Sequence, residues 1–170
     1  MPKVTVTEAV YQYLRPENSA ITYLGTVYTA LPKITNESDL FTNSYPGLGL
    51  GAVIYLFFTG QEERRIALGG PHDGRKFRIY DLGLLIIFKS DNRTTEEGQY
   101  AFDEFIDSLT AWIQADRNAG NPNVVFQWGE GTETEGPDIR LEYTMPRTLD
   151  GGVTLYQAVA RIKTCEILDT

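Results

Sequence analysis

The sequence predicts an α+β fold, a mainly antiparallel β-sheet with two helices packed on one face. Residues 76–88 form the longest near-continuous apolar run, and their β-branched and aromatic side chains are typical of a central strand buried on both faces. Residues 95–117 place large apolar side chains at helical spacing. The expected elements follow in the order helix, strand, strand, strand, helix, strand, strand, strand, which suits a sheet with its helices on one side.

The chain is expected to form one domain, residues 1–170, since its 170 residues match the usual size of a single domain and show no repeat or linker. Three segments, at about 32–50, 60–76 and 129–137, are rich in glycine, proline or charged residues and are expected to be long loops. Loops of this length in a compact domain are usually functional or ordered by a partner.

A short amphipathic helix is expected at residues 6–15. Thr5 and Glu8 have the spacing of a capping box, in which two side chains satisfy the first free amides of a helix. Pro16 cannot continue the helix, so the helix should stop at about Arg15.

Three strands are expected next, at residues 22–30, 52–59 and 77–88. Gly25 marks a bulge in the first, because glycine inside a strand often does so. The second and third are expected to pair antiparallel. The segment between them, 60–76, is expected to form a partly structured hairpin arm.

The most regular helical pattern lies at 95–117. Its apolar stripe consists of Phe102, Phe105, Ile106, Leu109, Trp112 and Ile113. Asp103, Glu104 and Asp107 lie off this stripe, on a face that is expected to meet solvent or another subunit. After the helix, strands are expected at 124–128, 139–144 and 155–167, and residues 146–152 are expected to connect the last two.

Charge is distributed unevenly along the chain. The net charge is −8, while residues 1–59 carry −1, residues 60–93 carry +2 and residues 94–170 carry −9. An acidic protein is poorly suited to wrap DNA or to bind nucleic acid nonspecifically, because both need clustered cations against phosphate. The local basic excess gathers at Arg64, Arg65, Arg75, Lys76 and Arg78.

The sequence predicts no catalytic, cofactor-binding or metal site, and hence no enzyme. His72 is the only histidine and lies in a turn, where nothing supplies the other members of a triad or metal site. Cys165 is the only cysteine and is expected to be a core or edge residue, since its sequence neighbours supply no base. A single cysteine forms no intrachain disulfide, which fits either a reducing compartment or a fold that needs no disulfide.

Other candidate sites are weaker still. The acidic residues between Glu130 and Asp138 fit no EF-hand spacing and are expected to form a hairpin tip. The glycines of 47–51 precede a strand, whereas a phosphate-binding loop follows one. The N-terminus lacks the apolar core of a signal peptide, and the apolar segments 48–58 and 82–88 are too short to cross a bilayer as helices.

The basic arm and the acidic helix suggest a contact between copies of the chain. The alternative is that the arm cations are solvated and paired with Glu62, Glu63 and Asp73. If copies form a ring, the arm of one copy meets the acidic 94–138 region of the next in a head-to-tail contact, which closes when the rotation permits.

This pattern of elements resembles the tail terminator (tail completion) proteins of long-tailed bacteriophages, the lambda-type minor tail protein U group. The resemblance rests on the short N-terminal helix, the strand that runs into Pro32, the paired strands 51–59 and 76–88 with a long insertion, the capped helix 95–117 and the final strand 156–167. It is a likeness of architecture, without a diagnostic short motif. The 32–50 loop and the 129–152 segment depart from the pattern.

The resemblance implies a structural protein of the virion neck, assembled in the host cytoplasm and needing no cofactor. Such proteins form rings, usually hexamers, that cap the tail tube and join it to the head connector or stopper protein. DNA passes through the lumen without specific binding, and no membrane is involved. Loops with little core of their own would become ordered against a partner.

Three other functions are compatible with the same pattern. A tail-tube subunit also forms rings with long loops, but it polymerises into filaments by itself, whereas a terminator caps them. The second possible function is that of a different head–tail adaptor protein. A small ligand-binding α+β domain is the third, and it needs a concave polar site that the single histidine, single cysteine and scattered acids do not form.

Overall fold

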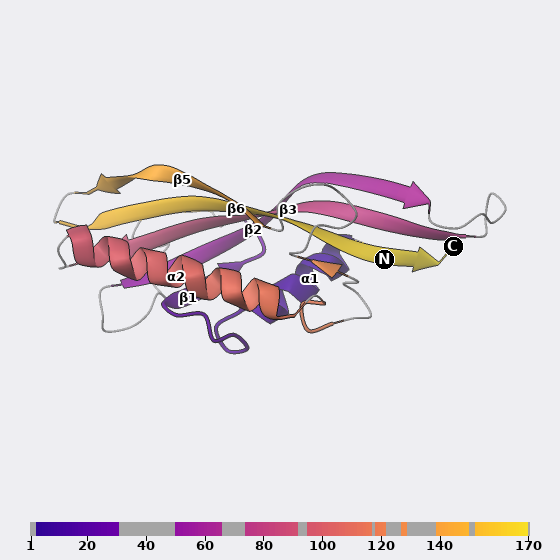
Figure 1. Cartoon of the computed structure of the whole chain (residues 1–170), viewed down its shortest axis with the longest axis horizontal. Helices are drawn as coiled ribbons and strands as arrows, with labels where there is room; N and C mark the ends of the chain where they lie inside the picture. Colours follow the sequence, from indigo (N-terminus) through magenta and orange to yellow (C-terminus); the bar gives the residue numbers. More distant parts are fainter. Residues whose placement is uncertain are drawn as a thin grey trace.

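The computed structural model describes eight segments of the chain: residues 3–30, 50–65, 74–91, 95–116, 118–121, 127–128, 139–149 and 152–169. Two helices and six strands follow one another in the order that the sequence predicts (Figure 1). They are α1 (Lys3–Leu14), β1 (Leu24–Tyr28), β2 (Leu50–Arg65), β3 (Arg75–Ser90), α2 (Thr95–Ala115), β4 (Gln127–Trp128), β5 (Ile139–Thr148) and β6 (Thr154–Asp169).

The six strands form one sheet in which β2, β3 and β6 lie at the centre. The strand order is β1-β2-β3-β6, and both β4 and β5 pair with β6. β1 runs parallel to β2, and all the other pairings are antiparallel. Both helices lie on the same side of the sheet (Figure 1). The predicted α+β class, with a mainly antiparallel sheet and helices on one face, is therefore confirmed.

The three central strands are longer than the sequence predicts, at 16 residues each. One part of each strand, the body, carries the helices. The other part, here called the arm, comprises residues 60–65 at the end of β2, 75–81 at the start of β3 and 163–169 at the end of β6, and it continues past the helices (Figure 1). The prediction of a loop at 60–76 is wrong at its two ends, because residues 60–65 and 75–76 are strand. Pairing with β6 holds these charged residues in a ladder, a tertiary effect that their own pattern does not indicate.

A bulge between Phe58 and Gly60 marks the boundary between body and arm. A side chain on Gly60 would place its Cβ 2.7 Å from an oxygen of Asp81, so the bulge requires glycine or a shifted aspartate. Next to this bulge, on the body side, Phe57 of β2 pairs with Gly83 of β3. The ring of Phe57 lies across Gly83 and leaves no room for a Cβ on that glycine.

The main core lies between the sheet and the helices. In α2 five of the six predicted stripe residues are buried, and Trp112 is half-buried. Phe88 of β3 is at the centre, with its ring 5.6 Å from that of Phe102 and 5.9 Å from that of Phe105. On the other face of the sheet, Val53, Tyr55 and Leu155 form a smaller buried cluster. The central strands therefore bury apolar side chains on both faces.

Several predicted boundaries are wrong by a few residues. α1 begins at Lys3, so Thr5 lies inside the helix and not at the position before it. β5 runs through Pro146 to Thr148, where the sequence predicts a connection. β5 pairs only with β6 among the described strands, and an edge position tolerates proline because no partner needs its missing N–H.

The predicted bulge near Gly25 is confirmed, since the β1–β2 register shifts between Leu24 and Thr26. The predicted loop at 129–137, and that at 32–50 except its last residue, lie outside the described residues.

Candidate functional site

The five predicted interface cations all lie on arm strands. Arg64 and Arg65 end β2, while Arg75, Lys76 and Arg78 begin β3. The antiparallel register places Arg65 directly opposite Lys76 and Glu63 directly opposite Arg78. The hairpin therefore brings together residues that the sequence separates by the whole insertion.

Arg78 is partly buried and is held by a network that crosses all three arm strands. Its guanidinium lies 2.6 Å from a carboxylate oxygen of Glu63 and 3.4 Å from one of Glu166 on β6. The hydroxyl of Tyr80 donates to the same Glu166 oxygen at 2.7 Å. Burial, reinforced by the bond to Glu166, raises the pKa of Tyr80 to about 12. The hydrogen bond from Arg78 lowers the pKa of Glu63. Arg78 thus links the three arm strands within one copy.

Arg64 is also engaged, since its Nε donates to Glu62 at 2.9 Å. Arg65 and Lys76 differ. They face each other across β2 and β3, and neither makes an ion pair with any residue in the described part of the chain. Like charges directly opposite in a sheet destabilise the fold. Of the predicted interface set, these two cations are therefore the pair most available to an external anion.

The predicted acidic residues of α2 form an exposed face. Asp103, Glu104 and Asp107 all point away from the core. Glu104 accepts a hydrogen bond from the hydroxyl of Tyr23, at 3.2 Å, and Asp103 accepts one from Gln99, at 2.8 Å. Burial raises the pKa of the nearby Tyr143 hydroxyl, and the negative charges of Asp103 and Asp107 raise it further. The face is accordingly a site of negative potential.

Within one copy, the arm cations and the acidic helix face lie apart. α2 packs over the body, with Phe102, Phe105 and Leu109 on residues such as Leu84 and Ile86. The arm continues beyond the helices (Figure 1). The structure therefore brings Arg65 and Lys76 together, and groups Asp103 with Asp107, but leaves the two groups separate.

Two notable features are missing from the sequence-based site. Glu166 is 2% exposed, which is unusual for a carboxylate and reflects its bonds to Tyr80 and Arg78. The two-residue periodicity of β6 gave a usable signal, since Glu166 follows Ile162 and Thr164 on the face that meets the helices. The exposed apolar side chains of Tyr143 and Met145 on β5, 60% and 88% exposed, were also missed.

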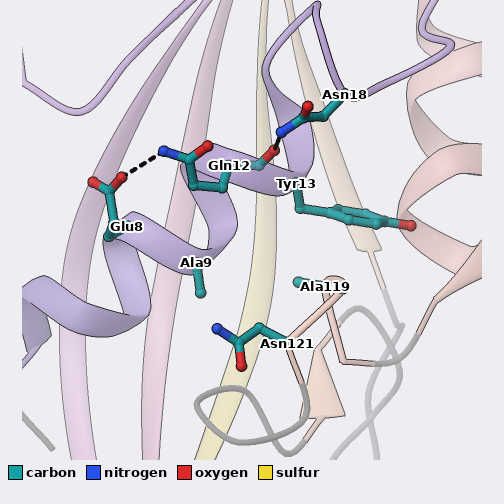
Figure 2. Close-up of a pocket in the computed structure, with 8 residues that line it drawn as sticks. Glu8, Ala9, Gln12, Tyr13, Asn18, Ala119 and Asn121 are labelled. Carbon is teal, nitrogen blue, oxygen red and sulfur yellow. Dashed lines mark hydrogen bonds between the residues drawn. The ribbon is translucent and has the colours of Figure 1, made fainter.

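A cavity of about 400 Å³ lies between α1 and the turn after α2 (Figure 2). Its walls carry the side chains of Glu8, Gln12, Asn18 and Asn121 over a floor formed by Ala9, Tyr13 and Ala119. The Gln12 amide donates to Glu8 at 2.7 Å, and the Asn18 amide donates to the Gln12 carbonyl at 2.7 Å. These bonds already use several of the polar groups, and the cavity contains no nucleophile–base pair.

No three His, Cys, Asp or Glu side chains in the described part of the chain lie close enough to hold a metal ion. Cys165 is buried and unoxidised, as expected for a core residue. His72 and the acidic segment 130–138 lie outside the described residues. No helix of the described segments is long and apolar enough to cross a membrane.

No protein-family model matches the sequence, and no curated protein matches it either. The described structure offers two charged surfaces, a strand arm that ends in two adjacent cations and an acidic helix face on the body.

Proposed function

We propose that the chain is a structural protein of the bacteriophage neck, a tail terminator that assembles into a ring, caps the tail tube and joins it to the head connector. Copies contact one another head to tail, with the arm of one copy on the α2 face of the next. Six copies per ring is the number that the resemblance implies. The DNA path is the lumen, and no cofactor takes part.

The observation that carries this proposal is the opposition of Arg65 and Lys76. Two cations held face to face across a hairpin repel each other, and this repulsion lowers the stability of an isolated molecule. A partner that brings carboxylates between them turns the repulsion into attraction. The α2 face offers such groups in Asp103 and Asp107, one turn apart and exposed.

The separation of the two surfaces supports a ring over a closed dimer. A two-fold dimer uses the same patch on both copies. Here the arm is one surface and the α2 face on the body is the other, so after a single contact each copy still has one of the two surfaces unused (Figure 1). Repetition of this contact produces a ring when the rotation closes.

The net charge of −8 supports a passage for DNA that does not trap it. A protein surface that neutralises phosphates binds DNA tightly and with strong salt dependence. An acidic ring repels the phosphates of the passing duplex instead. The cations of the arm do not oppose this, because the proposed contact places them against a neighbouring subunit.

The test is the assembly state of the purified chain, alone and with tail tubes, measured by light scattering and negative-stain electron microscopy. We expect rings, either alone or at the ends of supplied tubes, and tubes that stop growing once capped. Filaments of the chain alone would identify a tail-tube subunit. A monomer at high concentration that leaves tube growth unchanged would overturn the proposal.

A further inference from the structure

The cavity of about 400 Å³ between α1 and the turn after α2 lies apart from both charged surfaces of the proposed ring (Figure 2). Its described lining includes neither Arg65 and Lys76 of the arm nor any acidic residue of α2. A volume of this size is within the range of small-molecule sites. A ligand bound here would therefore be a property of the single copy, in addition to assembly.

Both walls of the cavity are held in place. Two reciprocal hydrogen bonds, of 2.8 and 3.2 Å, fasten Tyr13 of α1 to Trp112 of α2. The turn on the other side is held by Asp116, whose carboxylate accepts from the main-chain N–H groups of Asn118 at 2.8 Å and Gly120 at 3.2 Å. A site with walls fixed in advance loses little free energy to ordering when a ligand enters.

The only charged side chain among the described lining residues is Glu8. Its carboxylate accepts from the Gln12 amide at 2.7 Å, and no other group of the described structure bonds it. Arg15 contacts Gln12 at 3.1 Å from outside the lining, but it is paired with Glu17 at 3.3 Å. A cleft lined by charge of one sign attracts ligands of the opposite sign, so this cavity favours a cation.

The wall opposite Glu8 carries a second polar group. Asn121 is half-buried, and Figure 2 shows its side chain across the cavity from α1. Its main-chain N–H is bonded within the turn, whereas its carboxamide has no partner in the described segments. The floor between the two walls is apolar and consists of Ala9, Tyr13 and Ala119. A ligand that suits all these groups has a positive end and a short apolar stem.

We propose that this cavity binds an alkylammonium group. An ammonium has three donors and no acceptor, so it can donate to the second carboxylate oxygen of Glu8 and to the carbonyl oxygen of Asn121 and keep one bond to water. Its alkyl stem lies on the apolar floor. Free alkylamines and the side chain of lysine both carry this group, and suitable probes separate the two sources.

A series of ligands that differ in charge tests the proposal by NMR titration of the isotope-labelled chain at pH 7. Butylamine is an ammonium ion at this pH, 1-butanol is neutral and pentanoate is an anion. We expect a Kd of about 1 to 10 mM for butylammonium, binding at least about threefold weaker for 1-butanol, and no saturable binding of pentanoate. Equal binding of the alcohol and the ammonium would overturn the proposal.

The length of the stem distinguishes a cavity from a surface counterion. Methylammonium carries the same charge but lacks three methylene groups, so it should bind about tenfold more weakly than butylammonium. Equal binding of the two would show that only the exposed charge of Glu8 is sensed, and this result would also overturn the proposal.

Glu8→Gln removes the charge and retains an acceptor for Gln12. It should weaken butylammonium by about three- to tenfold and leave 1-butanol unchanged. Glu96→Gln is the matched control, because Glu96 is also an exposed helix carboxylate that accepts from a side chain four residues on, that of Tyr100. Butylammonium should bind this variant as it binds the wild type. Equal losses in the two variants would reflect net charge alone and contradict the proposal.

The methylamide of N-acetyl-lysine separates the two sources of the ammonium. If it binds as well as butylamine, the cavity admits a lysine side chain of another protein, and if only butylamine binds, the ligand is a free amine. The titration needs no assembly, so it is independent of the ring. If butylamine produces no saturable shifts in α1 and the 116–121 turn, the alkylammonium site is refuted and the ring proposal still stands.

Discussion

Tyr13 of α1 and Trp112 of α2 bond each other's main chain. The Tyr13 hydroxyl donates to the Trp112 carbonyl at 2.8 Å, and the Trp112 indole N–H donates to the Tyr13 carbonyl at 3.2 Å. The two rings stack with centroids 5.3 Å apart. This reciprocal contact ties the end of one helix to the end of the other, so that the helices cover the sheet as one layer.

Removing one half of that contact should destabilise the fold measurably. Tyr13→Phe keeps the ring stack but deletes the hydrogen bond, and we expect the free energy of unfolding in urea to fall by about 1 kcal/mol. Tyr100→Phe is the matched control. Its hydroxyl donates to Glu96 at 3.2 Å on an exposed surface, so its loss should change stability by less than about 0.5 kcal/mol. Equal effects for the two variants would contradict the structural role of the Tyr13 bond.

Alkaline pH should unfold the protein through its buried tyrosines. Burial raises the pKa values of Tyr55 and Tyr80 to about 12, above the unfolded value of 10.0. A raised pKa means that the folded state keeps its protons longer, so stability is full below pH 10 and falls as the pH rises from 10 to 12. Each group accounts for on the order of 2 to 3 kcal/mol over that window.

The pH dependence of urea unfolding between pH 9 and pH 12 checks this. Tyr80→Phe and Tyr55→Phe should each flatten the decline. Only Tyr80→Phe should also lower the stability at pH 7, by about 1 to 3 kcal/mol, because it leaves the buried Glu166 without its tyrosine donor. A wild-type curve that stays level up to pH 12 would show that neither hydroxyl is buried in solution.

The elements that the sequence predicts well are those whose own pattern determines them. The stripe from Phe102 to Ile113 indicates α2 without further information, because helical spacing and burial coincide there. The central strands were likewise indicated by apolar runs. The parallel pairing of β1 with β2 left no local signal, since either direction suits the residues of such a short strand.

The arm was harder to predict because contacts with neighbouring strands, and not the pattern of its own residues, stabilise its strands. Residues 61–65 are polar throughout and lack the alternation that indicates a strand. Their ladder with β3, the ion pair of Glu63 with Arg78 and the buried Glu166 hold them extended. Charge alone also gives no sign that Arg78 lies between two carboxylates of the same copy, because only the register brings Glu63 and Glu166 beside it.

A methyl group at Gly83 should strain the sheet. The ring of Phe57 lies where the new Cβ would be, and Phe57 is held by the ladder. We expect Gly83→Ala to lower the melting temperature, with a cost of about 1 to 3 kcal/mol. Phe57→Leu in the same chain should recover part of the loss, because it removes the crowded ring. A Gly83→Ala variant as stable as the wild type would place the Phe57 ring elsewhere.

Charge exchange tests the proposed contact of arm and helix. Arg65→Glu with Lys76→Glu should raise the concentration at half-assembly by roughly tenfold. Asp103→Lys with Asp107→Lys should have a similar effect. Copies with reversed arms, mixed with copies with reversed helices, should assemble again, because opposite charges face each other once more. Monomer stability should not fall in the arm variant through loss of an ion pair, since the described structure gives Arg65 and Lys76 none.

A control separates this contact from net charge. Glu17→Lys alters an exposed carboxylate outside both surfaces, although its ion pair with Arg15 is lost. Assembly of this variant should match the wild type. Failure of the two reversed variants to recover together would indicate that the arm and the α2 face do not meet.

Shortening the arm tests whether the arm is needed for folding or for assembly. The β2–β3 register determines which residues can be joined in a shortened arm. Deleting 61–75 would join Gly60 to Lys76, which are not partners in the β2–β3 register. Gly60 lies opposite Asp81, whereas Lys76 lies opposite Arg65. Replacing residues 64–77 by Asn-Gly instead joins the opposed pair Glu63 and Arg78 through a two-residue turn.

The variant in which Asn-Gly replaces 64–77 retains the Glu63–Arg78–Glu166 network and the whole helix-covered core, so it should unfold cooperatively. It should not assemble, because it lacks the two opposed cations Arg65 and Lys76. Replacing only 66–75 by Asn-Gly keeps Arg65 opposite Lys76 and should still assemble. Circular dichroism melts and light scattering of both variants provide the measurement. If the 64–77 variant does not fold while the 66–75 variant does, the arm stabilises the domain itself, and its length is explained without a ring.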